Sequence, residues 1–262
     1  MSGVDWNGIL CLPDAALAGD RRIPKTVLVK QAMLTKTEQK RLDKVARLEH
    51  FATVQKSTTR IPPYEDDERN VQSVVFLRCE MAAGTMAVAE VAELVHKCFP
   101  NPTVLLIEAN GRTCVSVALT RKSQAEQGAT VVDRIEATGA FDPGRPGYAP
   151  FLDALDFAKL PQDDLLAYLQ GIAWAVRLSR SITSLGFYPM CADRNREQLG
   201  KLIARSDALA KEVSDNRQRR RDRGLSLNES AKLRVDTKRL EAEFDSVMGL
   251  IKSICTLGDT VE

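Results

Sequence analysis

The 262-residue sequence has few of the residue types, and none of the short motifs, on which most catalytic sites depend. It contains two histidines, His50 and His96, which excludes a histidine-rich metal site. Neither glycine-rich phosphate loop (GxGxxG or GxxxxGK followed by Ser or Thr) occurs, and the GxSxG turn of serine hydrolases is absent as well. We therefore expect no catalytic residues, no metal and no cofactor, and these absences favour a protein that is not an enzyme.

Long hydrophobic runs and closely spaced cysteines are also missing. No apolar run approaches the ~20 residues that cross a bilayer. The first residues show no basic stretch followed by an apolar one, so we expect no secretory signal. The six cysteines are scattered, form no CxxC pair and have apolar neighbours, so we expect them to pack as small hydrophobic side chains. These absences predict a soluble cytoplasmic protein with reduced thiols and no membrane contact.

Neither sign of charge dominates the chain as a whole. The 37 Lys and Arg residues against 35 Asp and Glu residues give a formal net charge of +2. Any electrostatic function must therefore come from local clustering. One such cluster places five arginines within seven positions: Arg217, Arg219, Arg220, Arg221 and Arg223.

Helix and strand patterns alternate over residues 1–141. Thr35 followed three residues later by Glu38 predicts a capping box at the start of a helix. Residues 47–61 alternate only in part between apolar and polar side chains, whereas residues 71–81 are β-branched and apolar, as in a buried strand. Both stretches are expected to be strands.

The pattern continues with a helix and a hairpin. Apolar residues at helical spacing predict a helix over residues 83–100. Asn110-Gly111 separates two apolar runs and predicts a β-hairpin with a type I′ turn, and residues 130–139 predict one more strand. This order predicts the α+β class, with a mixed α/β sheet domain.

Prolines and glycines over residues 139–150 predict a domain boundary, and everything after it reads as helical. We expect a mixed α/β domain over 1–141, a linker and connecting helix over 142–190, and an antiparallel coiled-coil hairpin over 191–262. The hairpin rests on mostly apolar positions that recur alternately every three and four residues. They are Leu199, Leu202, Ser206, Leu209 and Val213 in the first arm, and Leu233, Thr237, Leu240, Phe244, Val247, Ile251 and Ile254 in the second.

The arginine cluster falls where the first arm of this hairpin ends. Arginines in a last helical turn complement its unpaired carbonyls, and Ser226 with Glu229 predicts the capping box of the next helix. This accounts for one or two of the five arginines. The rest form either a solvated tip without a ligand or a contact surface for DNA phosphates or a partner protein. The cluster contains no aromatic residue, which argues against base stacking.

Two other functions stay open. Glu80 and Glu108 end two apolar runs and Lys122 ends a third, so a divergent metal-dependent nuclease could use them if the three side chains converge. The compact acid-x-lysine motif is missing, however. Alternatively, two hairpins could pair and make the protein a structural homodimer.

Several short motifs resemble one protein family. They are Ile23-Pro24-Lys25, Leu34-Thr35-Lys36, Pro100 with Pro102, the hairpin that ends at Lys122, and the basic loop that leads through Asn228 into a heptad helix. Together these motifs are similar to the family known as domain of unknown function 4391. The sequence departs from that family in its first strand, where only Phe51 is left of an aromatic-rich stretch.

The resemblance implies a bacterial protein found beside helicases and DNA methyltransferases of restriction-like antiphage systems. It implies no catalytic residues, and it assigns Pro24, Lys25, Lys122 and Asn228 only as motif positions. We therefore expect a non-catalytic accessory subunit. Its α/β domain would dock on a larger helicase or methyltransferase subunit, and its basic tip would contact DNA or a second protein.

Overall fold

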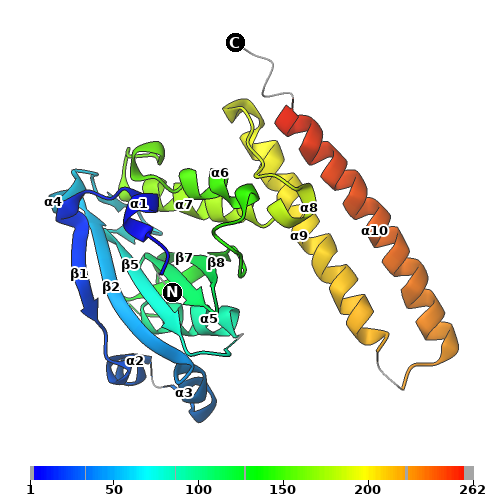
Figure 1. Ribbon diagram of the computed structural model, residues 1–262, viewed down its shortest axis with the longest axis horizontal. Helices are drawn as coiled ribbons and strands as arrows, with labels where there is room; N and C mark the ends of the chain where they lie inside the picture. Colours follow the sequence, from blue (N-terminus) through cyan, green and yellow to red (C-terminus); the bar gives the residue numbers. More distant parts are fainter. Residues whose placement is uncertain (1–2, 33, 86, 127, 222–223, 257–262) are drawn as a thin grey trace. The chain divides into compact units, whose positions relative to one another are not determined.

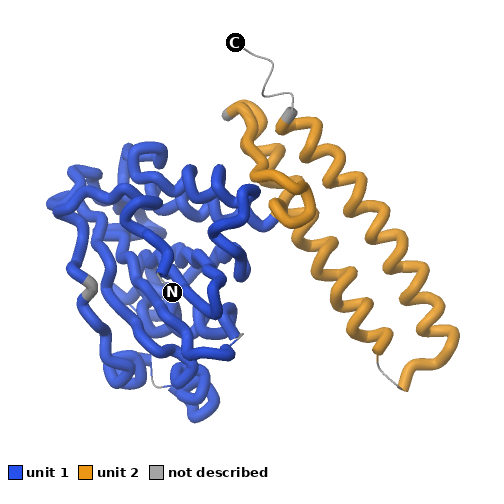
Figure 2. The backbone as a smooth tube through the Cα atoms, in the orientation of Figure 1, with its two compact units in different colours: residues 1–180 blue, residues 181–262 orange. Residues whose placement is uncertain are grey.

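The computed structural model describes residues 3–32, 34–85, 87–126, 128–221 and 224–256. The chain divides into two compact units, Met1–Arg180 and Ser181–Glu262 (Figure 2). None of the helices in the described ranges is long and apolar enough to cross a membrane.

The first unit is built on a mixed sheet, shown in Figure 1, whose strands follow the order β1-β2-β5-β6-β7-β8 in the described part of the chain. These strands are β1 (Leu17–Arg22), β2 (Val45–Gln55), β5 (Ser73–Met81), β6 (Thr103–Ala109), β7 (Arg112–Lys122) and β8 (Thr130–Ala137). Strands β5 and β6 are parallel and the other neighbours are antiparallel. Helix α5 (Val88–Cys98) makes the crossover that a parallel pair requires.

Helices cover both faces of this sheet, giving three layers (Figure 1). Helices α2 (Lys25–Ala32) and α3 (Lys36–Leu42) contact α5, and together they enclose the core on one face. Helix α7 (Leu165–Ser179) packs on β7 and β8 from the other face, with α6 (Ala149–Asp153) and α1 (Trp6–Leu10) beside it. The predicted mixed sheet domain of the α+β class is confirmed.

Shorter elements connect these layers. They are η1 (Asp14–Ala16), α4 (Lys56–Thr59), β3 (Tyr64–Glu65), β4 (Asn70–Val71), η2 (Pro146–Tyr148) and η3 (Phe157–Lys159) in the first unit, and α8 (Ile182–Leu185) and η4 (Asp193–Asn195) in the second.

Two short motifs adopt the local structures that the sequence predicts for them. Thr35 accepts a hydrogen bond from the main-chain N–H of Glu38, and the Glu38 carboxylate accepts one from the N–H of Thr35 at 2.8 Å. Asn110 and Gly111 have φ angles of 51° and 75°, the left-handed values that a type I′ turn needs. That turn sets the register of the β6–β7 hairpin, in which Ala109 pairs with Arg112.

The segment that we expected to be a linker is largely part of the first unit. Residues 146–179 form η2, α6, η3 and α7, and α7 buries Leu165, Leu169, Ile172 and Val176. That apolar face packs on the strands, so the compact unit extends to Arg180, beyond the expected boundary at residue 141. The physical reason is that β7 and β8 need a helix over their second face.

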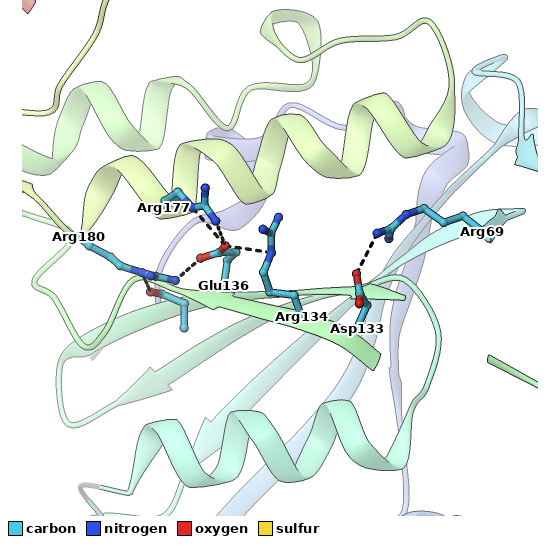
Figure 3. A network of polar contacts seen from close by, with 7 residues as sticks. Arg69, Asp133, Arg134, Glu136, Arg177 and Arg180 are labelled. Atoms are coloured by element: carbon cyan, nitrogen blue, oxygen red, sulfur yellow. Dashed lines mark hydrogen bonds and ion pairs between the residues drawn. The ribbon is translucent and has the colours of Figure 1, made fainter. Parts of the chain in front are cut away.

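A polar network fixes the end of α7 to the edge strand β8 (Figure 3). The Glu136 carboxylate on β8 accepts hydrogen bonds from Arg177 at 2.9 and 3.2 Å and also pairs with Arg180. Arg134 approaches the same carboxylate to 3.2 Å, while Arg180 donates to the carbonyl of Ala137. A buried acid is therefore satisfied by three guanidinium groups, as buried charge requires.

Both edge strands of the sheet are irregular. The pairing of β1 with β2 shifts register between Leu17 and Arg21, next to Gly19, whose φ is +66°. The pairing of β7 with β8 shifts between Leu119 and Thr120. Bulges of this kind bend a strand and increase its twist.

The second unit contains two long helices, α9 (Arg196–Arg219) and α10 (Leu227–Thr256), which pack side by side and run in opposite directions (Figure 1). At 1.5 Å per residue they are about 36 and 45 Å long. We call them the helical pair. Each of the seven positions expected to face the partner helix on α10 is buried or half-buried. On α9, Leu202 is only half-buried, and Ile203 occupies the fully buried position instead.

Candidate interaction site at the tip of the helical pair

The tip of the helical pair comprises residues 217–221 and 224–226. Helix α9 ends at Arg219, and Arg220 is its C-cap. Ser226 and Glu229 form the predicted capping box at the start of α10: the Ser226 N–H donates to the Glu229 carboxylate at 3.0 Å, and the Glu229 N–H donates to the Ser226 hydroxyl at 3.3 Å. Hydrogen bonds from the Ser226 hydroxyl and N–H lower the pKa of Glu229. The start of α10 is thus fixed by its own sequence.

The predicted arginines do not share one environment. Arg217 pairs with Glu241 of α10 at 2.7 Å, beside a hollow of about 450 Å³ that Ala210, Val213 and Phe244 help to line. The charge of Arg217 is therefore neutralised by a carboxylate of the helical pair itself. Arg223 lies outside the described residues.

Arg219, Arg220 and Arg221 are exposed. Within the described ranges their side chains form no hydrogen bond or ion pair, although the main-chain N–H groups of Arg220 and Arg221 still bond to carbonyls of α9. Three unneutralised guanidinium groups on consecutive residues attract phosphate or carboxylate oxygens, because each can donate two parallel hydrogen bonds. Within the described part of the tip, these three side chains offer positive charge and hydrogen-bond donors to an anionic surface.

The two glutamates considered for a nuclease do come together. Glu80 and Glu108 are register partners on the parallel strands β5 and β6. Both line a hollow of about 650 Å³ at the carboxyl ends of these strands, a common place for ligands in open α/β sheets. Glu108 already accepts hydrogen bonds from Trp6 Nε1 at 3.1 Å and from Arg78 Nε at 2.9 Å.

Lys122 does not join them. Strand β7 runs antiparallel to β6, so Thr113 pairs with Glu108 while Lys122 ends the same strand nine residues further on. At about 3.4 Å per residue, the lysine lies roughly 30 Å from the glutamates. Its Nζ donates to Glu65 at 3.0 Å and to the carbonyl of Asp66 at 2.7 Å. The three-residue arrangement that the nuclease alternative needs does not form, and the described residues hold no cluster of three or more metal-ligating side chains.

A family model described as Domain of unknown function (DUF4391) matches residues 10–244. The chain belongs to the DUF4391 family. The match runs through the sheet of the first unit and into the second half of α10, so the matched region includes parts of both units. No curated protein and no solved structure matches the chain.

The DUF4391 motif positions have structural surroundings of their own. Pro24 precedes α2, and its carbonyl accepts from the N–H of Val27 at 3.0 Å. Lys25 donates to the carbonyl of Asp43 at 3.4 Å. Asn228 is exposed in the first turn of α10. The contacts of Pro24 and Lys25 stabilise helix ends.

In this DUF4391 chain, the surroundings of His96 and of the buried cysteines indicate a packing role rather than a chemical one. His96 is fully buried, and its Nε2 lies 2.9 Å from the Ser116 hydroxyl; burial lowers its pKa to about 3. Burial also raises the pKa of Cys79 to about 12 and of Cys98 to about 11, so these thiols are unreactive. Cys11 differs from the expectation, because it is exposed at the left-handed end of α1.

Sequence reasoning missed the contacts that hold Glu108. Trp6 lies 102 residues away in the chain, and Arg78 belongs to a strand that becomes a neighbour only through the α5 crossover. No local pattern signals such a contact. The one local sign of a buried contact was Arg78, a charged residue in the otherwise apolar run 74–79.

Proposed function

We propose that this protein is a non-catalytic accessory subunit that binds an anionic partner through the tip of its helical pair. The observation that supports the proposal is the group of three exposed, unneutralised arginines, Arg219 to Arg221, at the end of two long helices. The partner class is the one that the family resemblance implies: a larger helicase or methyltransferase subunit of a bacterial antiphage system, or the DNA on which it acts.

The helical pair is suited to present such a tip. We infer that α9 and α10 supercoil as a coiled coil, because apolar and small side chains follow the three-four spacing along both. Ion pairs also link the helices, from Arg205 to Glu243 and from Arg217 to Glu241. A stiff pair limits the ordering entropy lost when its end binds a partner.

An accessory role is favoured over the nuclease because Glu80 and Glu108 lack their lysine. A homodimer through the helical pair stays as the second alternative. Light scattering that shows a monomer at high protein concentration would eliminate it.

The tip is tested by the combined variant Arg219→Gln, Arg220→Gln, Arg221→Gln. Its matched control removes three exposed cations from the sides of the same helices: Lys211→Gln, Lys232→Gln, Lys238→Gln. Wild-type and variant proteins are used as bait in lysate of the native cell, with mass spectrometry of the retained proteins, and in gel shifts with a random-sequence DNA duplex at low salt.

The tip variant is expected to lose the retained partner or at least tenfold in duplex affinity, with an unchanged melting temperature, whereas the control behaves like wild type. If each contact neutralises one phosphate, the salt dependence of DNA binding should fall by about 2.7 in the slope of log K against log salt. Equal retention by wild type and tip variant in both assays would refute the proposal.

A further inference from the structure

A second concentration of positive charge lies in the first unit. Residues 21–47, which we call the basic segment, contain nine basic residues against two acidic ones, Glu38 and Asp43. The other 235 residues are left with 28 basic and 33 acidic residues, a formal charge of −5. The nine are Arg21, Arg22, Lys25, Lys30, Lys36, Lys40, Arg41, Lys44 and Arg47.

The fold gathers this segment at one end of the sheet. It comprises the end of β1, the helices α2 and α3, and the start of β2, and Figure 1 shows the two helices next to each other below these strand ends. The apolar residues of the segment point into the core: Leu28, Leu34 and Leu42 are 0%, 6% and 2% exposed. Because the apolar sides of both short helices are used in this way, their charged sides face solvent.

Most of these cations have no counter-charge. Seven of them, Arg21, Arg22, Lys30, Lys36, Lys40, Arg41 and Lys44, are exposed and form no ion pair within the described residues. Glu38 does not neutralise them, because it pairs with Lys97 of α5 at 2.5 Å and caps α3 through Thr35. The same hydrogen bonds lower the pKa of Glu38 to about 2. The Lys97–Glu38 pair is therefore neutral as a whole and leaves the seven cations without a partner among the described residues.

The chemistry of the segment selects its partner. A membrane-binding helix needs an exposed apolar face, but here that face is buried, and Val27, at 37%, is the one large hydrophobic side chain of residues 21–32 and 34–47 that is exposed. Protein interfaces are built around apolar and aromatic centres, and the basic segment contains no aromatic residue. Bases could not stack on it for the same reason. What it offers is a dense set of Lys and Arg side chains with exposed hydroxyl groups at Thr26 and Thr37, the groups that contact phosphates.

We propose that the basic segment binds the sugar–phosphate backbone of a nucleic-acid duplex, without reading its sequence. This site is separate from the tip and does not depend on the proposed accessory function. Duplex DNA carries about one charge per 1.7 Å, so one turn of contact neutralises several of its phosphates and releases their counterions. Binding is therefore expected to be strongly salt-dependent and indifferent to base sequence.

The test is the combined variant Lys36→Gln, Lys40→Gln, Lys44→Gln. Glutamine has nearly the helix propensity of lysine, so α3 should be kept. The matched control removes three exposed cations of the same unit outside the segment, Lys56→Gln, Arg60→Gln and Arg145→Gln. Fluorescence anisotropy with labelled random-sequence duplexes of DNA and of RNA, equal in length, is recorded from low to physiological salt. Circular dichroism checks that each variant is folded.

Wild type and control should bind with the same affinity, and the α3 variant should bind at least tenfold more weakly at low salt. Its slope of log K against log salt should be smaller by about 2.7, which corresponds to three fewer phosphate contacts. Similar binding of the two duplexes supports recognition of the backbone alone, and a preference for one of them identifies the nucleic acid that the segment is shaped for.

Three outcomes overturn the inference: no binding of wild type to either duplex, equal loss in variant and control, or polyglutamate bound as tightly as the duplexes. The tip variant separates the two proposals. If the tip variant alone loses duplex binding, the basic segment is refuted. If the α3 variant alone loses it, the basic segment is supported and the tip does not contact the duplex, which leaves a protein as its partner. Loss in both variants supports both sites.

Discussion

Replacing Glu136 by glutamine should destabilise the first unit far more than an ordinary surface substitution. The Glu136 side chain is 4% exposed and lies among Arg134, Arg177 and Arg180. The amide keeps one acceptor oxygen but loses the charge, and its NH2 group faces guanidinium donors. Three like charges are then left next to one another without their counter-ion.

The size of the effect follows from the burial of these groups. Removing one partner of a fully buried ion pair costs about 3–5 kcal/mol. Here the side chains of Arg177 and Arg180 are 24% and 30% exposed, so water screens part of the remaining charge. We therefore expect a loss of about 2–3 kcal/mol. For a unit of this size, such a loss lowers the melting temperature by roughly 5–10 °C.

Urea and thermal unfolding followed by circular dichroism measure this loss. Asp133→Asn is the matched control, since Asp133 is on the same strand and pairs with Arg69 at 2.9 Å but is 34% exposed. An exposed pair contributes less than about 1 kcal/mol. A Glu136→Gln protein within 1 kcal/mol of wild type, or equal losses in the two variants, would show that the network does not hold α7 on the sheet.

Three further predictions concern single residues. Burial lowers the pKa of His96 from 6.5 to about 3, so its contribution to stability is complete above pH 6.5 and declines as the pH falls toward 3, by up to about 1.4 kcal/mol per pH unit. In urea titrations over this pH window, the stability of His96→Gln should decline less steeply than that of wild type. An equally steep decline in the variant would contradict the lowered pKa of His96. Gly111→Ala should lower the unfolding free energy by about 1–2 kcal/mol, because φ is +75° there, and calorimetry giving no loss would exclude the strained turn. Ser226→Ala removes a cap worth about 1 kcal/mol, detectable as faster hydrogen exchange in the first turn of α10 but not elsewhere in that helix.

Features that depend on a few neighbouring residues could be predicted from the sequence. The Thr35–Glu38 box, the Asn110-Gly111 turn and the buried positions of α10 each follow from spacing within one or two turns of chain. Strand β1 could not be predicted in this way, because Leu17–Arg22 is short, polar and interrupted by Gly19. It is a strand only because β2 supplies its hydrogen-bond partners.

In the candidate sites too, features set by neighbouring residues could be predicted from the sequence, and features set by the fold could not. The arginines of the tip are adjacent in the sequence and stood out at once, although the structure uses Arg217 inside the helical pair. The charges of residues 21–47 are spread over 27 positions and become a surface only when α2 and α3 fold against α5. Lys122 was grouped with Glu80 and Glu108 because all three end apolar runs. Strand β7 is antiparallel to β6, however, so its last residue, Lys122, lies at the opposite end of the sheet from the two glutamates.

The irregular borders of the sheet have a consequence for how copies of this protein meet one another. A straight outer strand offers a row of free amide and carbonyl groups on which a second sheet can grow. Here the Gly19 kink on one border and the displaced pairing opposite Thr120 on the other break that row. We expect these irregular borders to hinder the addition of strand to strand between molecules, and straightening either border by deletion should increase aggregation.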